Sequence, residues 1–463
     1  MKLFHVGLVA SLVMTFGGSV GYSLEVKGSV KQFNGWTLVS QQSVGDLAYF
    51  EVVIRTGSLS DPGDLHGLAN LTAHALLRGT QKYTYNQLTQ ALEKMGAQIS
   101  VSVDYNSTTL SAVVLSKNLD SFMDLLSAIL SDPGFFYEDS EVDRLKAILT
   151  SEIKNDTEDP RYLAGRALVQ TMYKGTGMEF PSRGTVAGLA KIKASDVRDF
   201  FKTYYSRQNM VVGVNSSKYE RDITTMWEQR FNNVLAGVSK PLALPASVVK
   251  GRKAVIVDRQ NMTTTPTYVS IPGVGDGDKD MLPLEVANFV FGADFTSRLV
   301  KVLRADKGWT YGAYSSFEYL TGQKADPGLF SIYTFPSAQF ASLAVPKAVE
   351  LLVEYQKNAI SQDELTYARD AMKNSYPFQN DTSTKKLGLA MREVLTGRKY
   401  IEDSYEYSRL LNALTLTGIN QTVANRLNTD NMVIAVVGDA KVLQPILAAI
   451  PGVTSVEVVD VQP

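Results

Sequence analysis

The stretch HGLANLTAHALLRGT, residues 66–80, contains His66 and His74, two of the three histidines in a chain of 463 residues. Leucine and alanine recur along it at the spacing of one helical face, and a glycine near its end is typical of a helix C-terminus. Asn70, Ala73 and His74 stand at positions i, i+3 and i+4 of this predicted helix. Their side chains are therefore expected to share one face of the helix.

That spacing invites comparison with the inverted zincin helix, H-x-x-E-H. In that motif the histidines at i and i+4 bind zinc, and the glutamate at i+3 polarises the attacking water. Here Asn70, whose neutral amide is a poor zinc ligand, stands in place of the first histidine. Ala73 stands in place of the glutamate and can neither accept a proton nor orient a water. Only His74 matches the motif, so the residues predict the helix without its hydrolytic chemistry.

The segment GLANLTAHALLRGT resembles the G-x-A-H-x-L-E-H-M-x-F-x-G-T signature of the pitrilysin/insulinase family, whose relatives include mitochondrial processing peptidase. The resemblance extends over essentially the whole mature chain. It includes SEIKNDTEDP, residues 151–160, where the family's third zinc ligand corresponds to Glu152. The apolar face of the helix beside Glu152 is expected to consist of Leu145, Ile148 and Leu149. By this resemblance only His74 and Glu152 remain, two ligands where catalytic zinc has three, and we expect no metal cofactor in this chain.

One rearranged metal site stays open as a hypothesis. His66 precedes Asn70 by four residues and would lie one helical turn further back, where it could join His74 and Glu152. Such a site would still lack the catalytic base. Zinc bound at one equivalent by the isolated chain, with chelator-sensitive hydrolysis, would support it.

A second signal lies in DFTSRLVKVLRADKGWTYGAYSSF, residues 294–317. We expect a helix, a turn at 306–308 and a strand that starts at Trp309. The segment resembles the family's C-terminal L-R-x-x-x-G-L-x-Y motif, and Arg304 and Tyr311 match the arginine and tyrosine that hold the substrate beside zinc. Both side chains donate hydrogen bonds, and such donors stabilise a peptide carbonyl as it becomes an oxyanion. Without the resemblance, these would be an ordinary surface arginine and a half-buried strand tyrosine.

The chain as a whole alternates predicted strands and helices, and parts of it repeat. A helix and strand at 194–215 recur at 414–440, both strands beginning with Asn-Met-Val, and residues 151–168 have an echo at 374–391. A stretch rich in proline, alanine and serine, typical of linkers, separates the two copies. We therefore predict an α+β fold of two homologous α/β-sandwich halves, which by the resemblance form half of a clam-shell chamber. The predicted limits are 25–234 for the first half, 235–253 for the linker and 254–463 for the second half.

The N-terminus and the composition bear on location and partners. Lys2, an apolar run at 6–16 and a small-residue stretch are typical of a secretory signal peptide, which we place at 1–24. The run is too short to span a bilayer, and the absence of cysteine excludes a lipoprotein anchor and thiol chemistry. The net charge of −1 gives no field that would attract nucleic acid. We expect an exported protein without a membrane anchor, and a bacterial periplasm is the first expectation for its location.

Some members of the family are split into one subunit with an intact zinc motif and a similar subunit without it. The resemblance therefore implies the non-zinc subunit of a heterodimeric peptidase, inactive alone, which contributes Arg304 and Tyr311 to a site whose zinc and base lie on a homologous partner. Its substrates would be peptides. The alternative is a catalytically inactive binding or scaffold protein, as in the core subunits of respiratory complexes, in which Arg304 is expendable.

Overall fold

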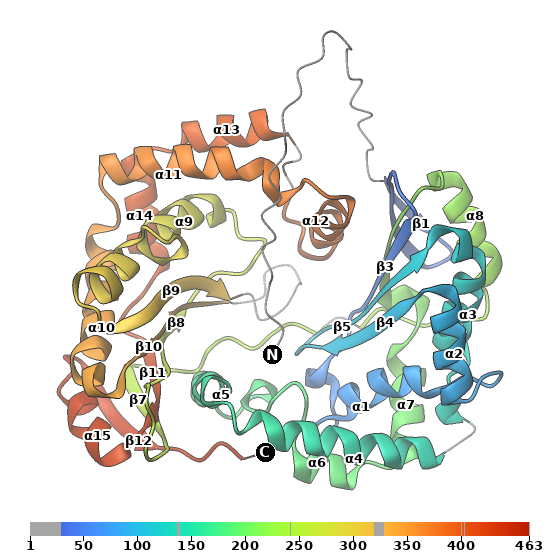
Figure 1. The fold of residues 1–463 in the computed structure, drawn as a ribbon, viewed down its shortest axis with the longest axis horizontal. Coiled ribbons are helices and arrows are strands. Elements are labelled where there is room, and N and C mark those ends of the chain that lie inside the picture. The colour runs from blue at the N-terminus through green and yellow to red at the C-terminus, as the bar shows by residue number, and fades with distance from the viewer. Residues whose placement is uncertain are drawn as a thin grey trace.

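The structure, a computed structural model, describes residues 29–136, 139–240, 242–318, 328–399, 401 and 403–462. The expected signal peptide at 1–24 lies outside the described residues. In the part of the chain that is described, no helix is both long and apolar enough to cross a bilayer. Two sheets stand on opposite sides of the molecule and are flanked by helices (Figure 1).

The first sheet has six strands in the order β1-β2-β6-β3-β5-β4. Its strands are β1 (Ser29–Phe33), β2 (Trp36–Gln42), β3 (Leu47–Ile54), β4 (Gln98–Val103), β5 (Thr108–Leu115) and β6 (Met210–Ser216). Alternate residues of β3, among them Phe50, Val52 and Ile54, are buried in one hydrophobic core, as period-two alternation requires. That core is completed mainly by α1 (Leu68–Ala75), α3 (Leu119–Ser131), α4 (Asp139–Asp156), α7 (Ala194–Tyr204) and α8 (Glu220–Arg230), with α2 (Tyr85–Met95) beside them.

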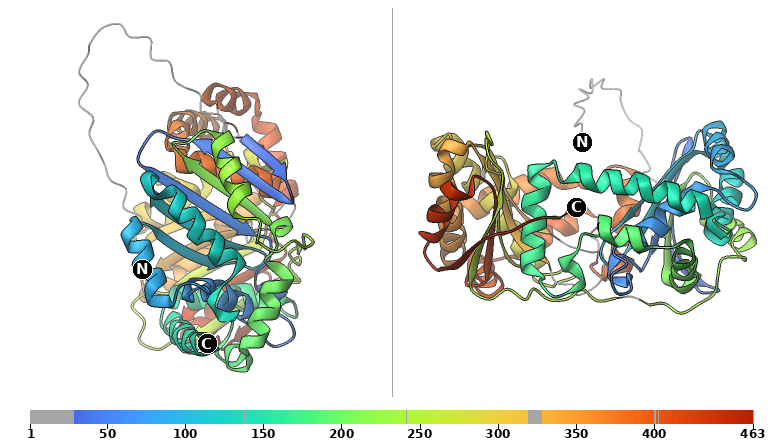
Figure 2. Two further views of the ribbon diagram at one scale, coloured as in Figure 1. Left: turned by 90° about the vertical axis from the view of Figure 1, so that its right-hand side faces the viewer. Right: turned by 90° about the horizontal axis from the view of Figure 1, so that it is seen from below.

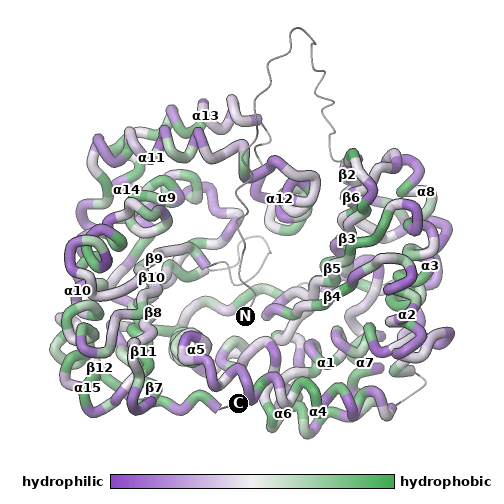
Figure 3. Tube along the Cα trace, viewed as in Figure 1, coloured by the Kyte–Doolittle hydropathy of each residue, from purple (hydrophilic) through white to green (hydrophobic). Residues whose placement is uncertain are grey.

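The second sheet also has six strands, in the order β12-β7-β11-β8-β10-β9. Its strands are β7 (Arg252–Asp258), β8 (Thr267–Pro272), β9 (Thr310–Glu318), β10 (Leu329–Pro336), β11 (Met432–Gly438) and β12 (Val453–Val458). Its helices are α9 (Met281–Asn288), α10 (Ala341–Asn358), α11 (Gln362–Ser375), α13 (Ser404–Ala413), α14 (Leu416–Arg426) and α15 (Ala440–Ala448). Apolar residues run along the central strands β6 and β11 of the two sheets (Figure 3).

The two sheets repeat one arrangement, which confirms the expected α+β fold of two similar halves. In each, the first central strand pairs in parallel with the late strand, β2 with β6 and β7 with β11. The late strand then pairs antiparallel with the next one, β6 with β3 and β11 with β8. The two Asn-Met-Val repeats in the sequence lead into β6 and β11, the equivalent strands.

Each half contributes one helix to the sheet of the other half. The helix α5 (Pro160–Met172) lies against β7, β8 and β11, whereas α12 (Ser383–Thr396) lies against β2 and β6. Both helices occupy the sheet faces that are turned toward the centre of the molecule (Figures 1 and 2). The helix α5 overlaps the segment 151–168, and α12 overlaps its echo at 374–391. The repeated segments therefore correspond to the two helices that the halves exchange. The predicted domain limits stay a prediction, and the exchange means that packing crosses them.

Side-chain size explains how each exchanged helix approaches so closely. On the first sheet, Gly213 of β6 leaves room for Leu387 and Met391 of α12, both almost fully buried. A Cβ atom at Gly213 would lie 2.8 Å from the Met391 sulfur. On the second sheet, α5 inserts apolar side chains between valines of β7 and β11 in a separate core. The two contacts tie the halves together without a continuous sheet.

Candidate functional site

The helix of the opening stretch begins later than its sequence suggests. It runs as α1 from Leu68, and Gly67 before it has a φ of 108°, which L side chains rarely adopt. Asp61 holds this end, because its carboxylate accepts hydrogen bonds from the backbone amides of Gly67 and Ala69, each at 2.7 Å. Burial raises the pKa of Asp61 to about 7, against the opposite effect of these hydrogen bonds.

His66 therefore stands before the helix rather than on it. Its ring stacks on Phe180 with centroids 3.7 Å apart, and burial lowers its pKa. In the described part of the chain, no group of three or more His, Cys, Asp or Glu side chains is placed to hold a metal ion. The geometry thus gives no support to a rearranged zinc site that uses His66.

The motif positions on α1 are mostly turned into the protein. Asn70 is 4% exposed and donates a hydrogen bond from Nδ2 to the carbonyl of Arg183 at 3.2 Å, and Ala73 is fully buried. His74 is half-buried, and burial lowers its pKa, while the charge of Glu152 raises it and that of Arg183 lowers it. His74, Glu152 and Arg183 are therefore close enough to interact electrostatically.

Glu152 lies on α4, but the helix face differs from the expectation. Leu145 and Leu149 are buried as expected, whereas Ile148 is 41% exposed. Glu152 itself is exposed. The assignment of Ile148 to the buried face was wrong. A residue at the margin of an apolar stripe can lie outside the contact between the helix and the core. Glu152 accordingly points to solvent beside His74 rather than into the core.

Arg183 is the residue of this site that sequence reasoning missed. Its guanidinium pairs with Asp156 at 2.7 Å and remains about half exposed, at 51%. The loop that carries it reaches α1 through two glycines, because a Cβ atom on Gly184 would lie 2.3 Å from the Cα of Gly67. A cation thus stands beside the two side chains that match the family's zinc ligands. The only sequence signal was an arginine followed by a glycine, which is not specific.

The second predicted pair lies near the start of β9. Arg304 is in the last turn of a π-helix, Val300–Asp306, and its guanidinium lies 4.7 Å from the centroid of the Phe295 ring. A π-helical turn is uncommon and is often found at functional sites. Tyr311, the second residue of β9, is 79% exposed. The expected strand start at Trp309 is displaced by one residue.

Arg304 and Tyr311 are both available for binding. Within the described residues, Arg304 has no carboxylate partner, and no hydrogen bond joins it to Tyr311. Phe295, which is 66% exposed, was not singled out from the sequence, although an aromatic residue at that exposure is a common recognition element. The strand β9 pairs only with β10 among the described strands, so it forms an edge of the described sheet.

Two known families match this chain. Residues 37–186 match the family described as Insulinase (Peptidase family M16), and residues 191–372 match the one described as Peptidase M16 inactive domain. The matches together cover more than half of the chain. The chain belongs to peptidase family M16. This confirms the resemblance to the pitrilysin/insulinase family.

Similar proteins agree with that membership. Among curated M16 relatives, "Uncharacterized zinc protease YmxG" of Bacillus subtilis is 22% identical over 394 residues, 83% of this chain and 91% of that protein. "Non-peptidase homolog YmxG" of Helicobacter pylori is 24% identical over 388 residues, 83% of this chain and 87% of that protein.

Solved structures share the fold. A peptidase M16 inactive domain from Pseudomonas fluorescens has a TM-score of 0.79 at 19% identity, over 89% of this chain and 98% of that one. The first half of the periplasmic protease PqqL from Escherichia coli has a TM-score of 0.75 at 16% identity, over 91% of this chain and 93% of that one. Against the full PqqL chain, the match covers 48% of its length.

The M16 membership gives the substitutions their meaning. Asn70 and Ala73 stand where the family's hydrolytic motif has a metal ligand and the general base. The match to the inactive-domain family and the name of the Helicobacter relative agree with this loss. The protein is an inactive M16-like peptidase homologue, related in fold to the periplasmic protease PqqL, as the sequence led us to expect.

Proposed function

We propose that this M16 homologue is the non-zinc subunit of an exported heterodimeric zinc peptidase. Its partner would be a homologous chain with an intact H-x-x-E-H motif that holds the zinc and the general base. This chain would supply Arg304 and Tyr311, which bind the substrate peptide and stabilise the oxyanion that forms at the scissile carbonyl. The bacterial periplasm is the proposed location, in keeping with the periplasmic PqqL.

The observation that carries the proposal is the state of Arg304 and Tyr311. An arginine with a structural role usually pairs with a carboxylate, and the ring of a tyrosine with a structural role is usually buried. Arg304 instead has no carboxylate partner in the described part of the chain, and Tyr311 is 79% exposed. Two strong hydrogen-bond donors near the start of β9, neither with a hydrogen-bond partner among the described residues, are well suited to an external ligand.

The form of the substrate follows from the strand that carries Tyr311. A peptide in extended conformation can add to the free edge of β9 through backbone hydrogen bonds, and side chains on alternate positions then meet fixed surfaces. Tyr314 of β9 is 45% exposed and lies opposite Tyr333 of β10 in the register. Aromatic side chains of this kind give broad contact with little sequence specificity, which suits peptide substrates of varied sequence.

Two considerations support a paired arrangement. This chain retains the substrate-binding residues but lacks the hydrolytic ones, so a complete site needs a second protein. The match to the first half of PqqL, at about half of the full PqqL length, indicates that a related protease contains more than one unit of this size. We infer that the missing residues are supplied by a separate chain of similar length.

The test begins with a gentle pull-down of the tagged protein from its native host, followed by mass spectrometry of retained proteins. A stoichiometric partner with an intact H-x-x-E-H is the expected result. Recovery of the chain alone, or with an unrelated protein, would instead favour the binding or scaffold function.

The active complex is then assayed for peptide hydrolysis with substituted forms of this chain. Arg304→Ala and Tyr311→Phe are each expected to lower kcat by about 10²–10³-fold, the usual loss for one oxyanion donor. Arg259→Ala and Tyr405→Phe are matched controls, because Arg259 is exposed without an ion pair in the described part of the chain and Tyr405 is 78% exposed. Full turnover by the Arg304 and Tyr311 variants would refute the proposed role.

A further inference from the structure

A pocket of about 460 Å³ lies away from both sites described above, between α9, the C-terminal end of α11, α12 and α13. Its volume is within the range of sites for small organic ligands. Leu282, Met372 and Ile401 contribute apolar lining, and Phe289 adds an aromatic ring. The pocket belongs to neither the zinc motif nor the Arg304 and Tyr311 pair.

The aromatic wall of the pocket is held in place. Tyr376 and Tyr407 stack with ring centroids 3.5 Å apart, and the Tyr376 hydroxyl donates to the carbonyl of Ile401. Tyr407 is 6% exposed, and its hydroxyl forms no hydrogen bond with another described residue. Burial and the nearby charge of Glu285 raise the pKa of Tyr407, so the hydroxyl stays protonated. It therefore offers a hydrogen bond at a largely apolar wall.

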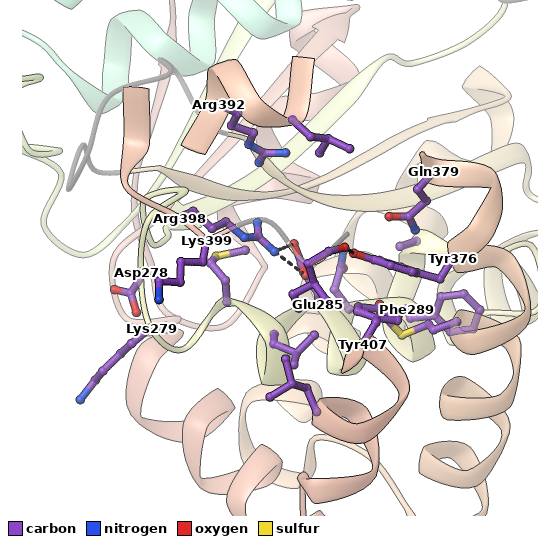
Figure 4. Close-up of a pocket in the computed structure, with 18 residues that line it drawn as sticks. Asp278, Lys279, Glu285, Phe289, Tyr376, Gln379, Arg392, Arg398, Lys399 and Tyr407 are labelled. Atoms are coloured by element: carbon purple, nitrogen blue, oxygen red, sulfur yellow. Dashed lines mark hydrogen bonds and ion pairs between the residues drawn. The ribbon is translucent and has the colours of Figure 1, made fainter. Parts of the chain in front are cut away.

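The opposite wall carries the charge. Figure 4 shows Arg398, Lys399 and Asp278 on one side of the pocket, and Phe289, Tyr376 and Gln379 on the other, while the Lys279 side chain extends away from the pocket. The pocket therefore has a charged side and a mostly aromatic side, so it is amphipathic.

The acidic groups of the charged wall are already neutralised. Glu285 binds Arg398 at 2.8 Å, and Asp278 pairs with Arg426. Lys279 and Lys399 are exposed and have no ion pair with a described residue. The charge left over at this wall is therefore positive, and it lies opposite the apolar wall.

We propose that this pocket binds a small aromatic carboxylate. Its ring would lie against Phe289 and the stacked tyrosines, and its carboxylate would face Lys399. Offset or edge-to-face contact with the aromatic wall, together with a charge-assisted hydrogen bond from Lys399, provides both parts of such recognition. The inference does not depend on the proposed peptidase role.

Because α12 lines this pocket, a ligand bound there would also affect the contact between the two halves. Leu389 and Arg392 of α12 line the pocket, whereas Leu387 and Met391, on the other face of the same helix, pack on the first sheet. A ligand in the pocket thus touches the helix that connects the two halves. Because a ligand that binds only the folded state stabilises it, occupancy should also strengthen the attachment of α12.

The first test is isothermal titration calorimetry of the full mature chain with 3-phenylpropionate and with indole-3-acetate. At least one acid is expected to bind at one equivalent, and its neutral amide is expected to bind at least about tenfold more weakly. The absence of binding by both acids in the millimolar range would overturn the proposal. Equal binding of acid and amide would overturn the role of the positive wall.

Variants locate the site. Lys399→Gln is expected to weaken binding about tenfold, and Ala293→Trp, at an exposed lining position, to abolish it. The control Ala448→Trp places the same bulk at an exposed position of α15 and should leave binding unchanged. The control Lys441→Gln, also on α15, removes a lysine without an ion pair. Binding that survives Ala293→Trp, or that is weakened equally by the controls, would place the ligand elsewhere and overturn the proposal.

Discussion

The docking of α12 on the first sheet can be tested by exchanging volume across one contact. Gly213→Ala adds a methyl group that would lie 2.8 Å from the sulfur and 3.0 Å from Cγ of Met391. Overpacking of this kind costs about 1–3 kcal/mol, and we expect about 1.5 kcal/mol because the methionine side chain can partly move aside. Met391→Ala removes three heavy atoms from a side chain that is 1% exposed, at a cost of about 3 kcal/mol.

The double variant should cost less than the sum of the two single variants. With Met391 shortened, the methyl group at position 213 loses its two shortest contacts, keeps one at 3.2 Å to Cδ1 of Leu387, and fills part of the cavity, which recovers about 1 kcal/mol. We therefore expect a loss of about 2 kcal/mol for Gly213→Ala with Met391→Ala, where additivity would give about 4.5 kcal/mol. The lower chain entropy of alanine in the unfolded state occurs in both the single and the double variant, so it cancels in the cycle.

Urea unfolding followed by tryptophan fluorescence provides the measurement. The chain has three tryptophans, and a Trp309→Phe background leaves Trp36 and Trp227, which contact each other in the core of the first sheet. The signal then reports the half onto which α12 docks. If the two substitutions are additive to within about 0.5 kcal/mol, the helix does not pack on β6 in solution and the exchange of helices is refuted.

Two further predictions concern titration and buried charge. The imidazole resonances of His66 and His74, assigned with His66→Gln and His74→Gln, should both titrate below the usual histidine pKa. Because the unfolded chain takes up these protons first, the two histidines lower stability as pH drops below about 6.5, whereas Asp61, whose pKa is raised to about 7, acts in the opposite direction. The stability of the parent protein relative to His74→Gln should therefore fall as pH drops through this range, and a resonance titrating at or above 6.5 would contradict this. Asp276→Asn should lower the unfolding free energy by about 2–3 kcal/mol, measured by urea unfolding, since a carboxylate that is 2% exposed pairs with Arg392 and Arg398. Lys386→Gln is a suitable surface control, and an equal effect of both substitutions would contradict the prediction.

The strands and the repeat were accessible from the sequence because they depend on local pattern. All seven residues of β6 and of β11 are buried, and most of them are apolar. Each run is preceded by a helix, and such runs are recognisable without tertiary information. The exchange of α5 and α12 was not accessible. An apolar helix stripe shows that a helix is buried but does not identify the sheet that buries it. The sheet that receives the helix is indicated only by the small size of the residue opposite it, such as Gly213.

The candidate site divides in the same way. Asn70, Ala73 and His74 could be placed on one helix because their spacing fixes their relation. Arg183 could not be placed, because it reaches α1 through a contact between two glycines far apart in the chain. Ile148 was placed on the buried face in error, because the spacing of apolar residues locates the apolar stripe of a helix but not the edge of its contact with the core.

The loss of zinc chemistry is built into more than one residue of α1. The Asn70 side chain donates to the carbonyl of Arg183, and that contact holds the loop whose guanidinium lowers the pKa of His74. A divalent cation placed between His74 and Glu152 would meet this fixed positive charge, and the repulsion is strongest where burial reduces the screening by water. Asn70→His would therefore not be enough to restore a metal site. The loop would lose its hydrogen bond from the Asn70 side chain, while the Arg183 guanidinium would stay nearby.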